Sequence, residues 1–366
     1  MDHKTRVMTA LDNQQPDRVP IFESNINEPV LQELREILGI AGEENGGEQS
    51  QIVSQESGDG GKKVDLYCDV VDTLGIDATC YKVSIELREV GDGKGEDKFR
   101  RVYRLSPHGE PLPVESRISG LEDLENFDMA AQLQGNDLRS VERVIQRFGE
   151  SRAHFLTLID PFKIGWRNRG GMQKFLMDFR RNQELVHALN RKATDYLLAV
   201  IDRAVELGID AFLMNGDYAD ERGLIFSRED YVEYFRPYHQ QLVEKVHQKG
   251  KKIIKHTDGK AWDLMEEFVK VGFDGFHPIQ PQCMDIEEVK AKYGDQLCLV
   301  GNIDCRELLV NGNPEEVRRT VKETILKAGA GGGYMISSSN SIHPGVKPEN
   351  YLAMVEATKE HGEYPL

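Results

Sequence analysis

The sequence predicts an α/β protein that folds as a closed (β/α)8 barrel, the TIM-barrel architecture. Two observations support this prediction: short apolar segments that end in polar residues recur along the chain, and amphipathic helical patterns separate them. A repeated strand–helix alternation places parallel strands inside and helices outside. An open doubly wound sheet is the alternative, but the sequence lacks the early Gly-rich phosphate turn that this fold normally carries.

Eight segments are predicted as strands, in chain order RVPIFES (18–24), DATCYKV (77–83), HFLTLIDP (154–161), DAFLMNGDYAD (210–220), KKIIKHTDG (251–259), FDGFHPIQP (273–281), QLCLVGNID (296–304) and GGYMISSSN (332–340). Apolar residues at helical spacing predict the helices between them, over 182–207, 227–249, 260–271, 284–293 and 313–329. Ser227 and Asn313 are typical N-cap residues, and Pro314 fits the first position of a helix.

Two stretches depart from the alternation. Residues 41–62 are rich in Gly, Glu, Ser and Gln, and we interpret them as a mobile surface insertion. Residues 84–117 contain two β-rich runs around GDGKGEDK, which predicts a β-hairpin that decorates the barrel. Since one decorated barrel accounts for the length, we predict a single domain over 1–366.

The composition excludes several classes of protein. Lys and Arg number 46 against 62 Asp and Glu, a formal charge of −16, so nucleic-acid phosphates would repel the chain. With 39% hydrophobic and 30% charged residues, the balance is that of a soluble globular protein. The chain shows no membrane-spanning apolar run, no signal-peptide core and an odd number of scattered cysteines, so we expect a cytoplasmic protein with free thiols.

Metal-type ligands gather at the strand ends, where barrel enzymes place their active sites. His256 and Asp258 lie two residues apart, so on a strand they point to one side. His277 ends the next strand, and Asp217 or Glu221 supplies a carboxylate from the strand before. Two imidazoles with one or two carboxylates suit zinc with a position open for substrate. Hydrogen-bonded loop histidines and helix-capping carboxylates are the alternatives.

From this set we predict His256, His277 and Glu221 as zinc ligands and Asp217, Glu221 and Asp258 as catalytic residues. The remaining strand-end side chains are candidates for substrate binding, namely Glu23, Asn25, Asp160, Tyr218 and Asn340. Cys298 is interpreted as a buried apolar residue, with a third metal ligand as the alternative, and His239 is interpreted as structural.

Four segments resemble the uroporphyrinogen-decarboxylase-like superfamily: MDHKTRVMTALDNQQPDRVPIF, LIFSREDYVEYFRPYHQQLVEKVHQKGKKIIKHTDG, FHPIQPQCMDIEEVKAKYGDQLCLVGNID and GGGYMISSSNSIHPGVKPENYLAM. The resemblance runs from residue 1 to about 360 and is weakest through 41–150. It implies a (β/α)8 barrel and one of two activities. One is decarboxylation of a porphyrinogen, and the other is methyl transfer involving a cobalamin-type (corrinoid) protein.

The segment after the first strand argues against the porphyrinogen. True decarboxylases carry an arginine-rich stretch there that holds the substrate's carboxylates, whereas this sequence reads PIFESNINEPVLQEL with no arginine before Arg35. An acidic segment would repel a polycarboxylate. The resemblance therefore favours the corrinoid-dependent methyltransferase branch.

The metal pattern departs from the thiol-methylating members of that branch, which hold zinc with a His-x-Cys pair and a later Cys. Here Asp258 replaces the first Cys, and Ser339 or Asn340 stands near the second. Imidazole and carboxylate leave zinc a harder Lewis acid than thiolates do, which suits an oxygen ligand. The hypothesis is an O-demethylating enzyme that transfers a methyl group from a small methyl ether, such as a methoxylated aromatic, to a corrinoid protein.

Two other functions remain open at this point: a decarboxylase-like lyase acting on a smaller carboxylate, and a non-catalytic barrel that binds a tetrapyrrole. The sequence leaves the oligomeric state open, with a homodimer as one possibility.

Overall fold

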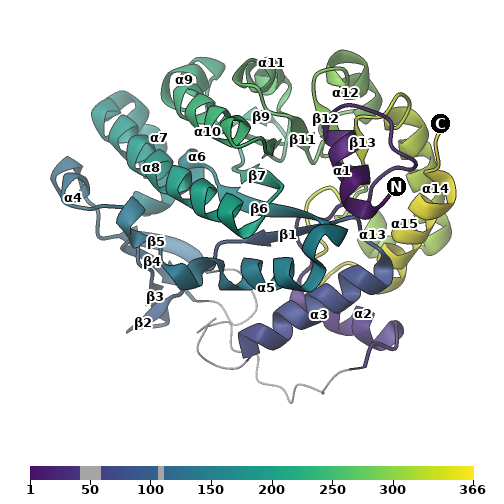
Figure 1. Cartoon of the computed structure of the whole chain (residues 1–366). Helices are drawn as coiled ribbons and strands as arrows, with labels where there is room; N and C mark the ends of the chain where they lie inside the picture. Colours follow the sequence, from purple (N-terminus) through teal and green to yellow (C-terminus); the bar gives the residue numbers. More distant parts are fainter. Residues whose placement is uncertain (42–58, 106–110) are drawn as a thin grey trace.

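The computed structural model describes residues 1–41, 59–105 and 111–366 of the chain. Its centre is a parallel sheet of seven strands in the order β1-β6-β7-β10-β11-β12-β13, curled into a barrel (Figure 1). The strands are β1 (Ala78–Lys82), β6 (Ala153–Ile159), β7 (Ala211–Asn215), β10 (Lys252–His256), β11 (Gly275–His277), β12 (Cys298–Val300) and β13 (Tyr334–Met335).

The predicted first strand, 18–24, closes the barrel between β13 and β1 without forming a regular strand. The Ile336 amide donates to the Pro20 carbonyl, and the Asp77 amide donates to the Ile21 carbonyl, both at 3.0 Å. Pro20 has no amide proton, and the Ile21 amide donates to the Asp77 side chain instead of a neighbouring strand. The eighth position of the predicted barrel is therefore filled by one isolated bridge, between Ile21 and Ile336, and by the hydrogen bond from the Asp77 amide.

Helices cover the outside of the barrel (Figure 1). They begin where the caps predict: the Ser227 side chain accepts from the Asp230 amide, and Asn313 and Glu316 cap each other reciprocally. The helices around the barrel are α2 (Glu28–Ile37), α3 (Asp59–Leu74), α5 (Arg139–Phe148), α6 (Pro161–Asn168), α7 (Met172–Arg181), α8 (Gln183–Leu207), α9 (Arg228–Tyr234), α10 (Arg236–Gln248), α11 (Trp262–Val271), α12 (Ile286–Tyr293), α13 (Leu308–Asn311), α14 (Pro314–Ala328) and α15 (Pro348–His361).

The barrel interior is a packed core, and helix α1 (His3–Leu11) closes its N-terminal end. The inward side chains form one cluster with three residues of α1, comprising Val7, Ala10, Leu11, Phe22, Ala78, Cys80, Ala153, Phe155, Ala211, Leu213, Ile254, Cys298, Val300 and Met335. Because α1 covers the end where the strands begin, the opposite mouth, where they end, is left for a site.

The stretch 84–117 differs from the predicted hairpin, because it forms a separate antiparallel sheet of four strands in the order β2-β3-β4-β5. Arg101 and Asp97 form a buried ion pair at 2.7 Å within it. The elements of this region are β2 (Arg88–Gly91), β3 (Lys94–Glu96), β4 (Arg101–Arg104), β5 (Leu112–Ser116), α4 (Leu121–Glu125) and the 3-10 helices η1 (Ala130–Gln132), η2 (Gly135–Leu138) and η3 (Gly149–Ser151).

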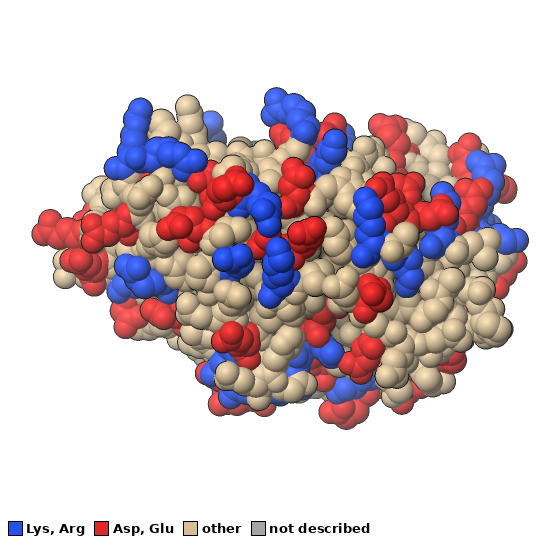
Figure 2. Space-filling model, turned by 90° about the horizontal axis from the view of Figure 1, so that it is seen from above, with Lys and Arg blue, Asp and Glu red and all other residues tan. Residues whose placement is uncertain are grey.

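The predicted insertion 41–62 lies largely outside the described residues, and its last four residues begin α3. No helix in the described ranges is long and apolar enough to cross a membrane. All five cysteines are free thiols. Figure 2 shows acidic and basic side chains interspersed over the face that it presents, with no broad basic patch.

Candidate functional site at the barrel mouth

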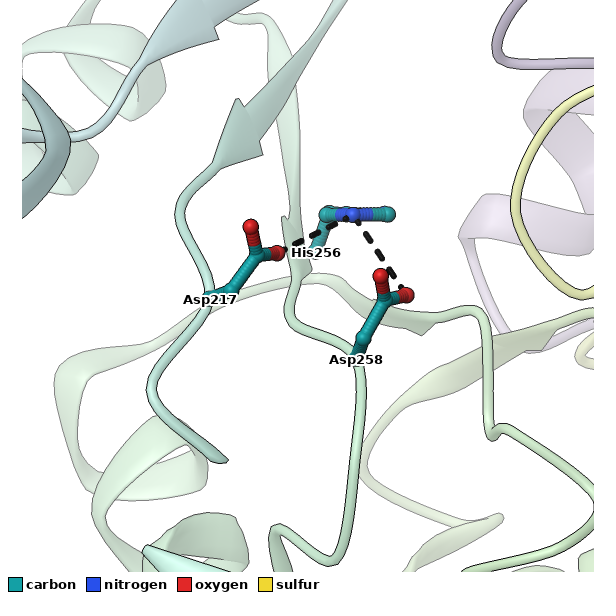
Figure 3. A group of neighbouring side chains, drawn as sticks. All are labelled: Asp217, His256 and Asp258. Atoms are coloured by element: carbon teal, nitrogen blue, oxygen red, sulfur yellow. Dashed lines mark ion pairs between the residues drawn. The ribbon is translucent and has the colours of Figure 1, made fainter. Parts of the chain in front are cut away.

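Three side chains converge where β7 and β10 end. His256 is the last residue of β10, Asp258 follows it by two residues, and Asp217 follows the end of β7 by two residues. The strands are parallel neighbours with His256 opposite Asn215, so the register brings the three together. Their ligand atoms all lie within 4.8 Å of one another, and both carboxylates point toward the imidazole (Figure 3).

In each carboxylate of this cluster, one oxygen accepts a hydrogen bond from a side chain and the other accepts none. Asn340 Nδ2 donates to Asp258 Oδ2 at 2.6 Å, and Lys163 Nζ lies 3.5 Å from Asp217 Oδ2. The two Oδ1 atoms are buried without a hydrogen-bond partner in the part of the chain that is described. They lie 3.5 Å (Asp217) and 3.8 Å (Asp258) from His256 Nε2. One nitrogen and two unpaired oxygens thus face a common point.

The two carboxyls titrate in opposite directions. Burial acts to raise the pKa of Asp217, but the close approach of His256 and the charge of Lys163 outweigh it and leave that pKa below its ordinary value. Burial and the neighbouring Asp217 charge raise the pKa of Asp258 despite the attraction of His256. Two acids this close resist ionising together, and a bound cation removes that conflict.

His277 lies behind His256 and contacts its Nδ1, the ring nitrogen that does not face the aspartates. The two Nδ1 atoms lie 2.6 Å apart, and His277 Nε2 lies 3.4 Å from Ser337 Oγ, which donates to the Ser338 carbonyl. Burial, and then the charge of His256, lower the pKa of His277 well below its usual range, so its ring is neutral. A consistent proton arrangement has His256 Nδ1–H donating to His277 Nδ1, and His277 Nε2–H donating to Ser337. In this arrangement His256 Nε2, the ring nitrogen nearer the two aspartates, is the one that can bind a cation there.

This donor set fits zinc. An imidazole nitrogen and two carboxylate oxygens are ordinary zinc ligands that leave a position for substrate. Buried carboxylate oxygens that accept no hydrogen bond are costly unless a cation lies beside them, and both Oδ1 atoms lie within ion-pair distance of His256 Nε2.

The structure does not bring two of the predicted ligands into this group. His277 has one nitrogen turned to His256 and the other to Ser337. Glu221 follows the short strand β8 (Ala219–Asp220), which pairs with β9 (Gly223–Leu224). This turn carries its side chain to the surface, where it is 60% exposed and bonded to Arg306.

The predicted substrate-binding residues are scattered. Asp160 and Tyr218 are fully buried and bond to each other at 2.6 Å. Glu23 is 3% exposed and accepts from the amide and hydroxyl of Ser338; burial raises its pKa to about 8 against these bonds. Asn25 is exposed. Of the five, Asn340 is the one whose side chain hydrogen-bonds to the cluster in the described ranges.

The alternative third ligand, Cys298, is fully buried among the barrel-core residues, and burial raises its pKa to about 12. Sequence reasoning missed Lys163, which also donates to Asn215 Oδ1 at 2.8 Å, and Lys255, which is buried beside His256. A signal existed for Lys255: it is a cation in a strand that the pattern predicts to be covered on both faces.

A closed (β/α)8 barrel with an imidazole and two carboxylates gathered at its C-terminal mouth is the architecture of a barrel enzyme. Residues 165–361, more than half of the chain, match the uroporphyrinogen decarboxylase (URO-D) family, and the protein belongs to that family. The resemblance to this superfamily is thereby confirmed.

Known relatives carry two activities. A uroporphyrinogen decarboxylase from Methylococcus capsulatus is 24% identical over 48% of this chain and 49% of its own length, so that match spans about half of the relative. The methylcobamide:CoM methyltransferase MtbA of Methanosarcina mazei is 22% identical over 69% of this chain and 72% of its own. A solved methyltransferase from Methanosarcina mazei shares the fold with a TM-score of 0.70 at 16% identity, covering 98% of this chain and 99% of that one.

Proposed function

We propose that this protein is a corrinoid-dependent methyltransferase that demethylates a small methyl ether. The C–O bond of the substrate breaks, the methyl group passes to the Co(I) of a separate corrinoid protein, and the oxygen leaves as an alcohol or phenol after taking up a proton. A methoxylated aromatic is the proposed substrate class. The observation that carries this proposal is the group of Asp217, His256 and Asp258, with its two unpaired oxygens and no sulfur.

The family supports the reaction class, and the donor set supports the oxygen substrate. A relative over two thirds of the chain is named a methylcobamide:CoM methyltransferase, so methyl transfer from or to a corrinoid occurs within the family. No cysteine belongs to the ligand group in the described chain, and a zinc ion held by nitrogen and oxygen prefers an oxygen ligand over a soft thiolate.

Asp217, His256 and Asp258 would hold the zinc ion, which supplies Lewis-acid polarisation of the leaving oxygen. His277 Nδ1 would accept from His256 Nδ1–H and so hold that ring with Nε2 toward the site. Asn340 holds the second oxygen of Asp258, so Oδ1 stays directed at the mouth.

Lys163 is proposed to deliver the proton to the leaving oxygen. Its side chain is 20% exposed at the mouth, and its ammonium lies beside Asp217 and Asn215. A general acid needs this combination of contact with the site and access to solvent.

The test is zinc content combined with methyl transfer. Purified protein should hold about one zinc per chain and transfer methyl groups from a panel of methoxylated arenes to chemically reduced cob(I)alamin, followed by absorbance. His256→Ala should lose both the bound zinc and the methyl transfer. Glu221→Ala is the matched control, because it removes a carboxylate at the same rim outside the cluster, and it should retain both. Full turnover by metal-free protein would contradict the proposal.

A decarboxylase-like lyase is the second candidate, because several relatives are named uroporphyrinogen decarboxylases. The acidic segment 20–34 speaks against a porphyrinogen. Consumption of uroporphyrinogen without any corrinoid acceptor would favour this candidate over methyl transfer.

A further inference from the structure

A fully buried ion pair lies directly behind the two strands that carry the cluster. Lys255 on β10 and Asp160 at the end of β6 are both inaccessible to solvent, and Lys255 Nζ lies 2.8 Å from Asp160 Oδ2. Lys255 neighbours His256 in the chain, so its side chain points outward from the barrel while that of His256 points into the mouth. The proposed function uses neither residue.

The Lys255 ammonium joins the two ligand-bearing strand ends. It donates to the Gly216 carbonyl and to the His256 carbonyl, each at 3.0 Å. The Gly216 carbonyl belongs to the peptide that enters Asp217, and the His256 carbonyl belongs to a ligand itself. The Lys255 ammonium therefore hydrogen-bonds to the backbone at both proposed ligands, Asp217 and His256.

Asp160 is in turn held rigidly. Its two oxygens accept from the Phe162 amide at 2.9 Å, the Tyr218 hydroxyl at 2.6 Å and His239 Nε2 at 2.8 Å, in addition to Lys255. Burial acts to raise the pKa of Asp160, but the charges of Lys255 and His239 hold it well below its usual range.

Asp160 also contacts the two segments that carry Lys163 and Asp217. It caps the start of α6, the helix that carries Lys163. It also packs against Gly216 so closely that a Cβ at that position would lie 2.3 Å from the Asp160 Cβ. The backbone before Asp217 is thus fixed by contact as well as by hydrogen bonds.

Stability alone gives little reason for such a pair. Replacing a buried ion pair with apolar residues of similar volume is often neutral or stabilising, because desolvation offsets the attraction. A charge is useful here because a single Nζ can satisfy several carbonyls at once, which an apolar side chain cannot do.

We propose that Lys255, held by Asp160, is a positioning residue that sets the spacing between Asp217 and His256 and thereby the metal affinity of the site. This inference rests on the proposed zinc site. Residues that orient ligands from behind typically change metal affinity by about 10–100-fold when they are removed.

The experiment compares Lys255→Met with Arg101→Met, which breaks an equally buried ion pair in the separate four-stranded sheet. Zinc affinity is measured by competition with a chelator, ligand geometry by the visible spectrum of the Co²⁺-loaded protein, and folding by thermal unfolding. Lys255→Met should bind zinc about 10–100-fold more weakly and change the Co²⁺ spectrum. Arg101→Met should lower the unfolding temperature and leave both metal readouts unchanged.

A second variant separates positioning from folding. Lys255→Met leaves Asp160 without its main cation, so the double variant Lys255→Met/Asp160→Asn removes the uncompensated charge and should regain stability while it retains the zinc defect. Recovery of zinc affinity together with stability, or equal zinc loss in Arg101→Met, would overturn the inference. Normal zinc affinity in Lys255→Met would overturn it and leave the proposed function standing. If the wild-type protein binds no zinc, both fail.

Discussion

Asp77 at the N-terminal end of the barrel and the pair Asp217 and Asp258 at its C-terminal mouth are buried carboxylates with opposite surroundings. At the N-terminal end, Asp77 is fully buried and each of its oxygens is satisfied. It accepts from His3 Nδ1 and Arg6 at 2.7 Å, from Arg18 at 2.9 and 3.0 Å, and from the Ile21 amide at 2.8 Å. This aspartate ties the N-terminal segment to the start of β1.

At the C-terminal mouth, Asp217 and Asp258 each keep one buried oxygen without a partner among the described residues. The same side chain therefore serves two purposes: where every lone pair has a protein donor, it supports folding, and where one is left free toward a histidine, it is available to a ligand. The following changes test that contrast, from the largest expected effect to the smallest.

Removing the nitrogen ligand should have the largest effect. Zinc binding at structural sites amounts to about 10–16 kcal/mol. If the ligands share it, His256→Ala costs several kcal/mol, so zinc affinity should fall more than ~1000-fold in chelator competition. Because His256 is buried against His277, the substitution should also lower the free energy of unfolding of the zinc-free protein, by about 1–3 kcal/mol, so zinc affinity is compared on the folded variant. Unchanged zinc affinity would remove His256 from the site.

Removing Asp77 at the N-terminal end of the barrel should lower stability strongly and leave zinc binding unchanged. Asp77→Ala leaves buried arginines without their partner and should lower the free energy of unfolding by about 3–5 kcal/mol in urea denaturation. Zinc content should remain that of the wild type. Loss of zinc in a folded Asp77→Ala protein would contradict the separation of the two ends.

The Asp77 effect should depend on pH. Burial acts to raise its pKa, but His3, Arg18, the Ile21 amide and Arg6 leave it below the ordinary value of 3.8. A depressed folded pKa gives stability that is present above the unfolded value and is lost as the pH falls through the folded one. The difference in stability between the wild type and Asp77→Ala should therefore shrink below about pH 4.

His277→Phe tests whether His277 orients the proposed ligand His256. The substitution keeps an aromatic ring but removes the acceptor for His256 Nδ1–H, so the tautomer and orientation of His256 are no longer fixed. We expect a drop in zinc affinity of about 10–100-fold with the metal stoichiometry retained. A complete loss of zinc would instead make His277 a direct ligand.

The smallest expected effect is a gain in the free energy of unfolding when Asp258 is replaced by asparagine. The raised pKa of Asp258 means that its favourable contribution is present at low pH and is lost as the pH rises through the folded value. In the presence of a chelator, Asp258→Asn should be more stable than the wild type at pH 7, by up to about 1 kcal/mol, and equal to it at pH 3. A less stable variant at pH 7 would show that Asp258 is already satisfied without a metal.

The sequence predicted the barrel, and it predicted that Asp217, His256 and Asp258 lie close together, because both follow from periodicity. Spacing by two residues places His256 and Asp258 on one side of a strand, and parallel neighbours carry Asp217 to the same edge. Periodicity does not determine how the loops after the strands direct their side chains. The β8–β9 turn sends Glu221 to the surface, and the cap of α6 turns Asp160 inward.

Pairing between side chains was equally hidden from the sequence. Periodicity places His277 at a neighbouring strand end, but it does not say that its Nδ1 meets the Nδ1 of His256. The four strands within 84–117 likewise depend on pairing β5 with β4, a contact that a hairpin pattern over the first two runs does not contain.

X-ray absorption at the zinc edge tests the central claim most directly. A site made by Asp217, His256 and Asp258 predicts a first shell of nitrogen and oxygen at about 2.0–2.2 Å, with no sulfur. Burial and the nearby charges of Glu221 and Asp258 raise the pKa of the half-buried free thiol of Cys283, so this thiol is the control: the same shell should keep its distances in Cys283→Ser. A zinc–sulfur shell at about 2.3 Å would contradict the account, because it would place a thiolate on the metal.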